Sequence, residues 1–356
     1  MKILHSADFH LNAPFSGRSP EEAEFLRRWL MEVPAMVADL CLAERCDLVL
    51  LAGDLFDSGD YTAAYPALYA ALERMAVPVF ITPGNHDYCD FQSPWLRERW
   101  PENVHVFTRS RMESVALPRL DCRVYGAGYE SMDCPGLLAG FLAEGEERYH
   151  IGVLHADPIN RNSPYCPVTA AQIRESGLHY LALGHIHKAD SFLTGETLCA
   201  WPGCTMGKGY DETGVKGVYI VELEETAQLR FVPLDVPCFY DDQVEAGMDP
   251  AAAAAELLPP GGSEDFYRIT LTGETENVNV EAIRQALGRY PHLQLRDQTT
   301  RLADVWSAVE DDSLEGAYFR MLRDAMEGQT EQQRRRIMLA ARISRQILDG
   351  QEVKLL

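Results

Sequence analysis

The chain has 356 residues, 46% of them hydrophobic, and it carries a formal net charge of −22 at pH 7. This length and composition predict a soluble globular protein with one large core and smaller satellite clusters. The acidity argues against a broad basic surface that grips nucleic acid through its phosphates. It does not exclude nucleic acid as a substrate, because metal ions or a partner protein can supply positive charge.

No segment predicts secretion or insertion into a membrane. The N-terminus lacks the pattern of a signal peptide, and no apolar run approaches the roughly 20 residues that a membrane-spanning helix needs. The nine cysteines include no C-x-x-C pair, a usage typical of reduced, buried thiols and not of a disulfide framework. We therefore expect a cytoplasmic protein without a membrane partner.

Short apolar runs alternate with helix signals through the first 235 residues. Ser19 before Pro20 predicts a helix start, and Thr169 with Gln172 has the spacing of a capping box. Strand–helix alternation followed by late strands predicts an α/β (α+β) architecture, a sandwich of two sheets flanked by helices. The predicted strands are 3–4, 48–51, 77–82, 104–107, 123–125, 149–154, 180–183, 218–223 and 229–233, and the predicted helices are 20–45, 63–75 and 169–177.

The composition shifts near residue 240, so we assign 1–240 to a first domain. A predicted helix at Asp249-Pro250 is followed by a Pro-Pro-Gly-Gly break. Two strands and a helix then complete a small α+β capping module at 241–300. The predicted elements of this module are the strands 266–272 and 293–295 and the helix 280–287.

Residues 301–356 contain two predicted helices, and capping-box spacing occurs at Asp312 with Glu315 and at Thr330 with Gln333. Each helix has an apolar face, which suits either a hairpin packed on its own core or an arm that docks on a partner helix. The face predicted for the first helix is Leu314, Tyr318, Met321, Leu322 and Ala325, and that of the second is Ile337, Ala340, Ala341, Ile347 and Leu348.

Five short motifs in one order carry most of the functional information, and most of them directly follow a predicted strand. Strand ends in an α/β sheet are where ligand sites collect. Taken alone, each motif is also typical of a helix cap, a polar turn or a core histidine. The five are Asp8-Phe9-His10, Gly53-Asp54-Leu55-Phe56-Asp57, Gly84-Asn85-His86-Asp87, His155, and Gly184-His185-Ile186-His187.

The motif side chains are the oxygen and nitrogen ligands that suit a pair of divalent ions. On an extended segment, Asp8 and His10 would project to the same side and hold one ion. The two carboxylate oxygens of Asp54 can bridge ions about 3.5–4 Å apart, an arrangement used to break phosphate esters. His185 and His187 can each ligate a different ion.

His86 has a different expected task. It neighbours Asn85, whose amide oxygen is a reasonable ligand, and so it points toward the place where a substrate would lie. A histidine there can protonate a leaving alkoxide or stabilise charge on the phosphoryl oxygens. Asp57 could accept a hydrogen bond from the other ring nitrogen and fix its tautomer.

Together, the five motifs resemble those of the calcineurin-like metallophosphoesterase superfamily over about residues 1–235. The resemblance implies two divalent metal ions, with manganese the choice typical of its nuclease branch and iron or zinc as alternatives. It implies that Asp8, His10, Asp54 and His187 hold the first ion, and that Asp54, Asn85, His155 and His185 hold the second.

Within this superfamily, the chain resembles the SbcD-like bacterial DNA repair exonucleases and especially their YhaO-type subgroup. One shared feature is the tripeptide His5-Ser6-Ala7 directly before Asp8. The others are the aromatic Phe56, the Lys188 that follows His187, and the stretches 201–203 and 212–217. This branch implies a DNA exonuclease or endonuclease. In its members, a cap shapes access of DNA, and terminal helices bind the coiled coil of an SMC-like ATPase.

Two other functions stay open. A phosphodiesterase or phosphatase acting on a small nucleotide or a phosphoprotein explains the acidity better, but it leaves the capping module and the terminal helices unexplained. A non-catalytic scaffold would use those helices to bind a coiled coil and would retain the site for structure alone. Association of two copies as a homodimer is also open.

Overall fold

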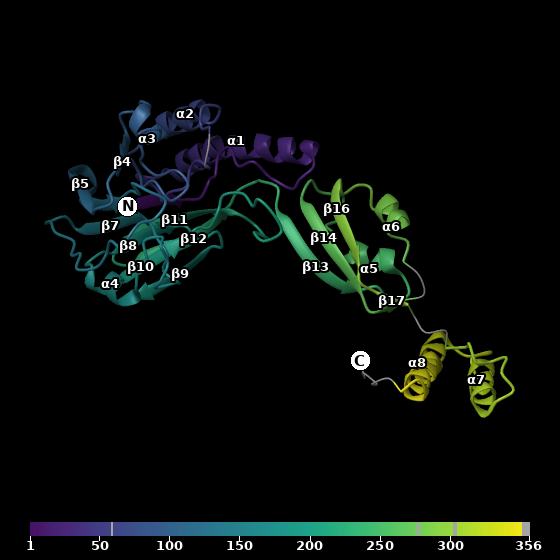
Figure 1. The fold of residues 1–356 in the computed structure, drawn as a ribbon. Helices are drawn as coiled ribbons and strands as arrows, with labels where there is room; N and C mark the ends of the chain where they lie inside the picture. Colours follow the sequence, from purple (N-terminus) through teal and green to yellow (C-terminus); the bar gives the residue numbers. More distant parts are fainter. Residues whose placement is uncertain (58–59, 276–277, 302–304, 351–356) are drawn as a thin grey trace. The chain divides into compact units, whose positions relative to one another are not determined.

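Two six-stranded sheets form the core of residues Met1–Tyr240 in this computed structural model (Figure 1). The first has the order β12-β11-β1-β2-β3-β4, and the second has the order β5-β6-β7-β8-β10-β9. The first comprises β1 (Lys2–Ser6), β2 (Leu48–Leu51), β3 (Val79–Ile81), β4 (Val104–Val106), β11 (Gly217–Leu223) and β12 (Ala227–Pro233). The second comprises β5 (Glu113–Leu117), β6 (Cys122–Ala127), β7 (Tyr149–His155), β8 (Tyr180–Gly184), β9 (Asp190–Thr194) and β10 (Thr197–Trp201).

The structure describes residues 1–57, 60–275, 278–301 and 305–350. Parts of the predicted segment 301–356, namely 302–304 and 351–356, therefore lie outside the described residues. The chain divides into two compact units, Met1–Tyr240 and Asp241–Leu356. None of the described helices is long and apolar enough to cross a membrane.

The core of the first unit lies between its two sheets. One cluster joins Leu50 and Phe80 of the first sheet to Ile151 and Val153 of the second, all of them buried. Strands β1 to β4 run parallel to one another, as do β6, β7, β8 and β10, so each sheet gathers its carboxyl ends at one edge. The predicted two-sheet sandwich is confirmed.

The outer helices begin where their sequence signals predict. Helix α1 (Pro20–Glu44) is capped by Ser19, whose hydroxyl accepts from the backbone N–H of Glu22, and it packs against α2 (Tyr65–Met75). Thr169 and Gln172 form the predicted capping box of α4 (Ala170–Glu175). The sequence missed β5, β9, β10 and β13 (Phe239–Glu245), as well as two strands of two residues each at 274–275 and 300–301. Of these, β5, β9 and β13 lie at the edges of their sheets, and β10 lies between β8 and β9. Helix α3 (Pro94–Arg97) is one short turn.

The two sheets approach each other closely beside the ends of β1 and β8. His5 of β1 is fully buried, and burial lowers its pKa to about 3, so its ring is neutral. Its Nε2–H donates to the Leu183 carbonyl oxygen at 3.0 Å, and Nδ1 accepts from the Tyr180 hydroxyl at 2.7 Å. One histidine thus ties the first sheet to the second.

The second unit contains a three-stranded sheet of order β13-β14-β16. Strands β14 (Phe266–Thr272) and β16 (His292–Asp297) pair in parallel, with α6 (Val280–Ala286) between them in the chain. The predicted helix after Asp249 is α5 (Pro250–Glu256). Two short strands, β15 (Glu274–Thr275) and β17 (Thr300–Arg301), also pair in parallel.

The terminal helices are α7 (Leu314–Asp324) and α8 (Glu331–Leu348), and the cap of α7 differs from the prediction. Ser313, not Asp312, caps α7, because its hydroxyl accepts from the backbone N–H of Gly316. The predicted apolar face of α7 is largely exposed: Leu314 is 90% and Met321 72% exposed, whereas Phe319 is fully buried in the local core. The expected capping box at Thr330 is present in α8.

We expect Gly184→Ala to destabilise the first unit. A Cβ at this position would lie 1.9 Å from the Ala52 carbonyl oxygen, so the sheets would have to separate. Overpacking of this kind costs about 1–3 kcal/mol, which urea unfolding measures. Gly288→Ala is the control, since the nearest atom there is 3.3 Å away. Equal stability of the Gly184→Ala variant and the wild type would contradict the close approach.

Candidate metal centre

Loops that follow five parallel strands bring all of the predicted site residues to one place. They follow β1, β2 and β3 of the first sheet and β7 and β8 of the second, at the carboxyl ends of the strands. This is the edge of an α/β sheet at which ligands bind. The residues are Asp8, His10, Asp54, Asp57, Asn85, His86, His155, His185 and His187.

The local conformation of the first motif differs from the prediction. Asp8 and His10 do not lie on an extended segment, because both have left-handed backbone angles, with φ of 53° and 49°. Asp54 and His185 are also left-handed, with φ of 50° and 87°. Non-glycine residues held there cost energy and cluster at functional sites. Backbone N–H groups of Asp8 and His10 donate to the carbonyl oxygens of Gly53 and Asp54, which fixes the two loops together.

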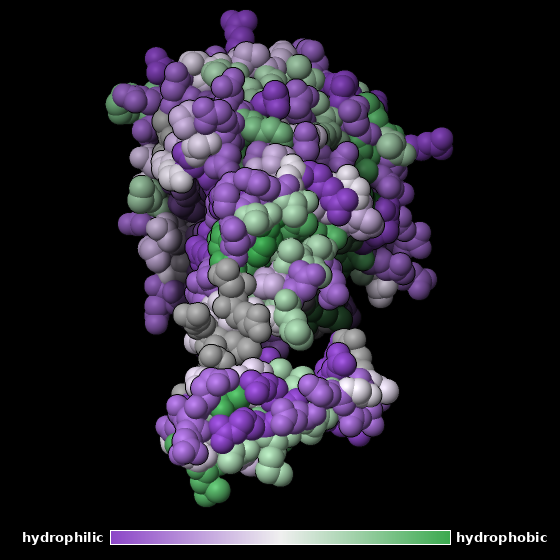
Figure 2. Space-filling model, turned by 90° about the vertical axis from the view of Figure 1, so that its right-hand side faces the viewer, coloured by the Kyte–Doolittle hydropathy of each residue, from purple (hydrophilic) through white to green (hydrophobic). Residues whose placement is uncertain are grey.

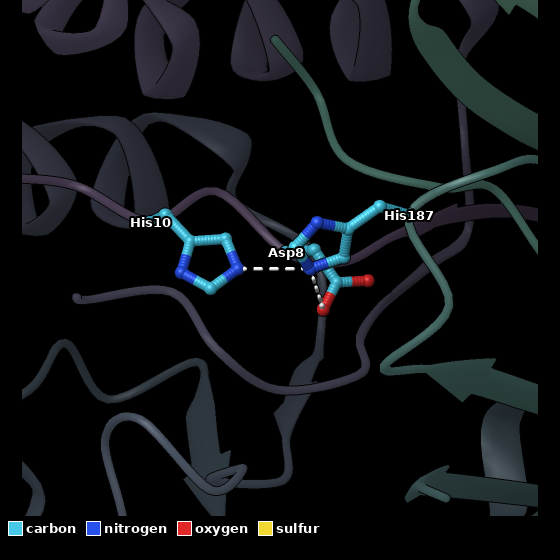
Figure 3. A group of neighbouring side chains, drawn as sticks. All are labelled: Asp8, His10 and His187. Carbon is cyan, nitrogen blue, oxygen red and sulfur yellow. Dashed lines mark hydrogen bonds and ion pairs between the residues drawn. The ribbon is translucent and has the colours of Figure 1, made fainter. Parts of the chain in front are cut away.

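Asp8, His10 and His187 form the first ligand-like group (Figure 3). The Nε2 atoms of His10 and His187 are 3.1 Å apart, and Asp8 Oδ1 lies 3.8 Å from His187 Nε2. Asp54 Oδ2 lies 3.9 Å from His10 Nε2. These are the four residues that the family resemblance assigns to one ion.

The second group contains Asp54, Asn85, His155 and His185. His155 Nε2 lies 3.3 Å from Asp54 Oδ2 and 3.0 Å from Asn85 Oδ1. The rings of His155 and His185 are 5.2 Å apart. Asp54 therefore touches both groups, which is the position that a bridging carboxylate requires.

Three histidines are oriented by a hydrogen bond on the far side of the ring. The Nδ1–H group of His10 donates to Asp57 Oδ1 at 3.2 Å, and that of His155 donates to the Ala52 carbonyl oxygen at 2.9 Å. The Nδ1–H group of His187 donates to Glu212 Oε1 at 2.6 Å. In the neutral form of each ring, these acceptors leave the lone pair on Nε2, which faces the cluster. Metal-binding histidines are held in this way, so the donor set fits divalent ions.

The electrostatics of the cluster also suit cations. Asp8 and Asp54 are 0% and 1% exposed. Burial, together with the negative charge of Asp54, raises the pKa of Asp87 to about 7. Burial lowers the pKa of His155, but the charge of Asp54 outweighs it and raises that pKa to about 9. The cluster thus holds an excess of buried negative charge, and its oxygen and nitrogen donors suit manganese, iron or zinc.

Asp87 has a role that the sequence did not reveal. Its buried carboxylate accepts from the backbone N–H of Gly84 at 2.7 Å, of Leu55 at 2.9 Å and of Phe56 at 3.3 Å. It therefore fastens the loop that carries Asp54 to the loop that carries Asn85. The motif contained Asp87, but nothing in it indicated which backbone groups it would bind.

Glu212 was also missed as a site residue. Its Oε1 accepts from His187, and its Oε2 accepts from the backbone N–H of Lys208 at 2.7 Å. Burial raises the pKa of Glu212, but the bond to His187 outweighs it and lowers that pKa to about 2. Asp157 is a further neighbour, with Oδ2 4.0 Å from His185 Nε2. Both contacts join segments distant in the chain, so no local pattern predicts them.

His86 lies at the mouth of the cluster. Its Nδ1–H donates to Asp57 Oδ1 at 3.0 Å, and its side chain is 38% exposed. The same oxygen accepts from His10, so Asp57 positions both rings. Asn85, His86 and Asp57 line a cavity of about 720 Å³, whose other walls include Phe56, Tyr61, Tyr88, Met132, Tyr165 and Arg97.

The sequence matches a known family over this region. Residues 1–189, more than half of the chain, match the model of the calcineurin-like phosphoesterases. The chain belongs to this family. The phosphoesterase is therefore a hydrolase of a family that uses a dinuclear metal site, and the resemblance seen in its motifs is confirmed.

Relatives of the phosphoesterase include bacterial and archaeal proteins. The metallophosphoesterase YhaO of Bacillus subtilis is 32% identical over 237 residues, which cover 63% of this chain and 57% of YhaO. The SbcD component of the nuclease SbcCD from the same bacterium is 27% identical over 269 residues, or 62% of this chain and 66% of SbcD. The DNA double-strand break repair protein Mre11 of Aeropyrum pernix is 26% identical over 234 residues, or 57% and 53%. The chain spans less than two thirds of the length of these relatives.

We expect Glu212→Gln to weaken metal binding about 10- to 100-fold, the usual effect of removing a carboxylate that orients a ligating histidine. The variant keeps the shape of the side chain and loses the charge that fixes His187. Calorimetric titration with Mn²⁺ measures the affinity. Glu222→Gln is the control, because Glu222 is exposed and pairs with Lys2. Unchanged affinity in Glu212→Gln would mean that His187 needs no such support.

Proposed function

We propose that this phosphoesterase is a DNA exonuclease or endonuclease that uses two divalent ions, most suitably manganese, and acts in DNA repair. The observation that supports it best is the convergence of seven oxygen- and nitrogen-bearing side chains, from five strand-end loops, on one buried cluster beside His86. Ions bound there would supply Lewis-acid chemistry to a phosphoryl group and lower the pKa of an attacking water.

In this proposal, His86 acts as the proton donor. The hydrogen bond to Asp57 raises the pKa of His86, which favours the protonated ring near neutral pH. His86 opens into the large cavity, so a leaving oxygen bound there lies within its reach. Asp57 keeps Nε2 of the ring directed away from itself and free to donate. Asp8, Asp54, Asn85 and the four remaining histidines would hold the ions.

Two observations favour a nucleic acid as the substrate. Relatives of this chain include a component of a nuclease and a double-strand break repair protein. The cavity beside His86 is lined by Tyr61, Tyr88 and Tyr165, and aromatic side chains bind nucleobases by stacking. Asp60 and Asp90 also line this cavity. Their negative charge repels a nucleic acid with many phosphates more than a small diester with one, so small diesters are the second candidate substrate.

We propose further that the chain has three working parts: a catalytic domain at 1–240, a capping module at 241–300 and a docking arm at 301–356. The arm would bind the coiled coil of an SMC-like ATPase. The support for this docking is a set of exposed apolar side chains on the two helices, Leu314, Met321, Ile347 and Leu348. Figure 2 shows hydrophobic residues among more numerous hydrophilic ones at the surface of this part of the chain.

The substrate test compares Mn²⁺-dependent cleavage of linear DNA with hydrolysis of bis-p-nitrophenyl phosphate and of cyclic nucleotides. We expect cleavage of DNA, increased by a coiled-coil ATPase partner. Hydrolysis of the small diesters without any cleavage of DNA, even with the ATPase present, would favour the second candidate. A chain that takes up no transition metal under any loading condition would instead be a scaffold.

The proposed roles predict opposite behaviour for two variants. His86→Gln should keep both ions and lose about 10²- to 10⁴-fold in turnover, the usual contribution of a general acid. Asp54→Asn should lose both ions, because the carboxylate between the two groups is gone. Metal analysis and turnover of bis-p-nitrophenyl phosphate separate these outcomes. Loss of metal from His86→Gln, with a normal rate in the metal-bound fraction, would refute the assignment of His86.

A further inference from the structure

Three of the five lysines of this acidic chain, Lys188, Lys208 and Lys216, gather beside the candidate metal centre. Lys188 directly follows His187 in the sequence. Lys208 donates its backbone N–H to Glu212, which in turn binds His187. The ammonium group of Lys208 also interacts electrostatically with His86 and His187. Lysine is otherwise scarce, so its concentration here points to a local role.

Lys208 interacts electrostatically with the carboxylates of Asp57 and Glu212, but none of the three lysines is held in a close ion pair among the described residues. Within the described ranges 1–57, 60–275, 278–301 and 305–350, no ion pair joins a carboxylate to any of the three. Lys2 shows the contrast, because it pairs with both Glu44 and Glu222. Acidic residues outnumber basic ones by 54 to 32, so ammonium groups without a close ion pair are unexpected. The ammonium groups of these lysines can therefore bind an anionic group of a ligand.

Lys216 makes the strongest case. It is 6% exposed, and among the described residues its ammonium group has no hydrogen-bond acceptor. Burying a charge without a partner is costly, so an anion bound beside this ammonium group would remove that cost. Lys216 lines a cavity of about 270 Å³ together with Lys188, His187 and Thr213. The aromatic rings of Tyr219 and Phe231 also line this cavity. Because they lower the local dielectric constant, the attraction between an ammonium group and a bound anion is stronger there than in water.

We propose that Lys216, Lys188 and Thr213 form a subsite for a second phosphate of the substrate, next to the one that is cleaved. This rests on the proposed function, since it assigns the neighbouring metal centre to a phosphodiester. The ammonium groups would bind the phosphate oxygens as charged donors, and the Thr213 hydroxyl would add a neutral one. Lys208 would add positive charge at the centre itself.

The position of the two cavities gives the subsite its specificity. The larger cavity reaches the cluster at Asn85 and His86, and the smaller one reaches it at His187. A substrate that occupies both would place an aromatic group against the tyrosines on one side of the cleaved phosphate and an anion against the lysines on the other. A nucleotide chain has this alternation, whereas a phosphorylated protein side chain lacks the second phosphate.

Binding of small nucleotides to the Mn²⁺-loaded chain of residues 1–356 tests the subsite without any catalytic step. Calorimetry would compare thymidine 3′,5′-bisphosphate with thymidine 3′-monophosphate and 5′-monophosphate. We expect the bisphosphate to bind about tenfold tighter than either monophosphate, or more, as a charged hydrogen bond typically provides. Lys216→Met should remove this preference, and Lys216→Arg should keep most of it.

Lys2→Met is the matched control and should retain the preference, because Lys2 pairs elsewhere. If Lys216→Met does not fold, Lys188→Met should reduce the preference in its place. Equal affinity of the wild type for all three nucleotides, or a preference that survives in these variants, would overturn the proposal. The outcome of the DNA cleavage assay is independent of this binding test. If the bisphosphate is preferred but DNA is not cleaved, the subsite stands and the nuclease is refuted. If DNA is cleaved but the bisphosphate is not preferred, the subsite is refuted.

Discussion

The burial of two carboxylates at the strand ends is the constraint on which the first unit depends. Asp8 and Asp54 have almost no contact with solvent, and in the part of the chain that the structure describes their ion-pair partners are histidines alone. Removing such charges from water is costly unless positive charge or hydrogen bonds compensate. Backbone N–H groups of His185 and His86 provide part of this compensation. Bound cations would provide the rest, which explains why so many loops converge here.

The glycines of the motifs serve the same cluster by leaving room for it. A Cβ at Gly53 would lie 2.4 Å from His155 Nδ1, and one at Gly84 would lie 2.3 Å from Asp54 Oδ1. A side chain at either position would occupy the space of a candidate ligand. Gly53 also has a φ of 88°, which other residues rarely adopt. Packing therefore requires glycine at both positions, and at Gly53 the backbone conformation requires it as well.

The sequence predicted the architecture well, because the alternation of strands and helices is a local pattern, and the structure brings the predicted site residues to one place. Buried strands such as 48–51 are continuous apolar runs, and the motif that follows each one is short. The left-handed turns at Asp8 and His10 were not predictable, since they arise from hydrogen bonds to a neighbouring loop. Edge strand β9 was missed because its five residues do not alternate regularly between apolar and polar. The exposure of Leu314 was not predictable, because helical periodicity does not say which apolar face packs within the chain and which stays at the surface.

The shared oxygen of Asp57 links two rings that have different proposed tasks. It accepts from His10, a candidate metal ligand, and from His86, the candidate acid. Any shift of this carboxylate toward one ring weakens its hold on the other. A change that strengthens the hydrogen bond from His86 to this oxygen therefore weakens the one from His10. A substitution near Asp57 can thus favour the proposed acid or the candidate metal ligand, but it can hardly favour both.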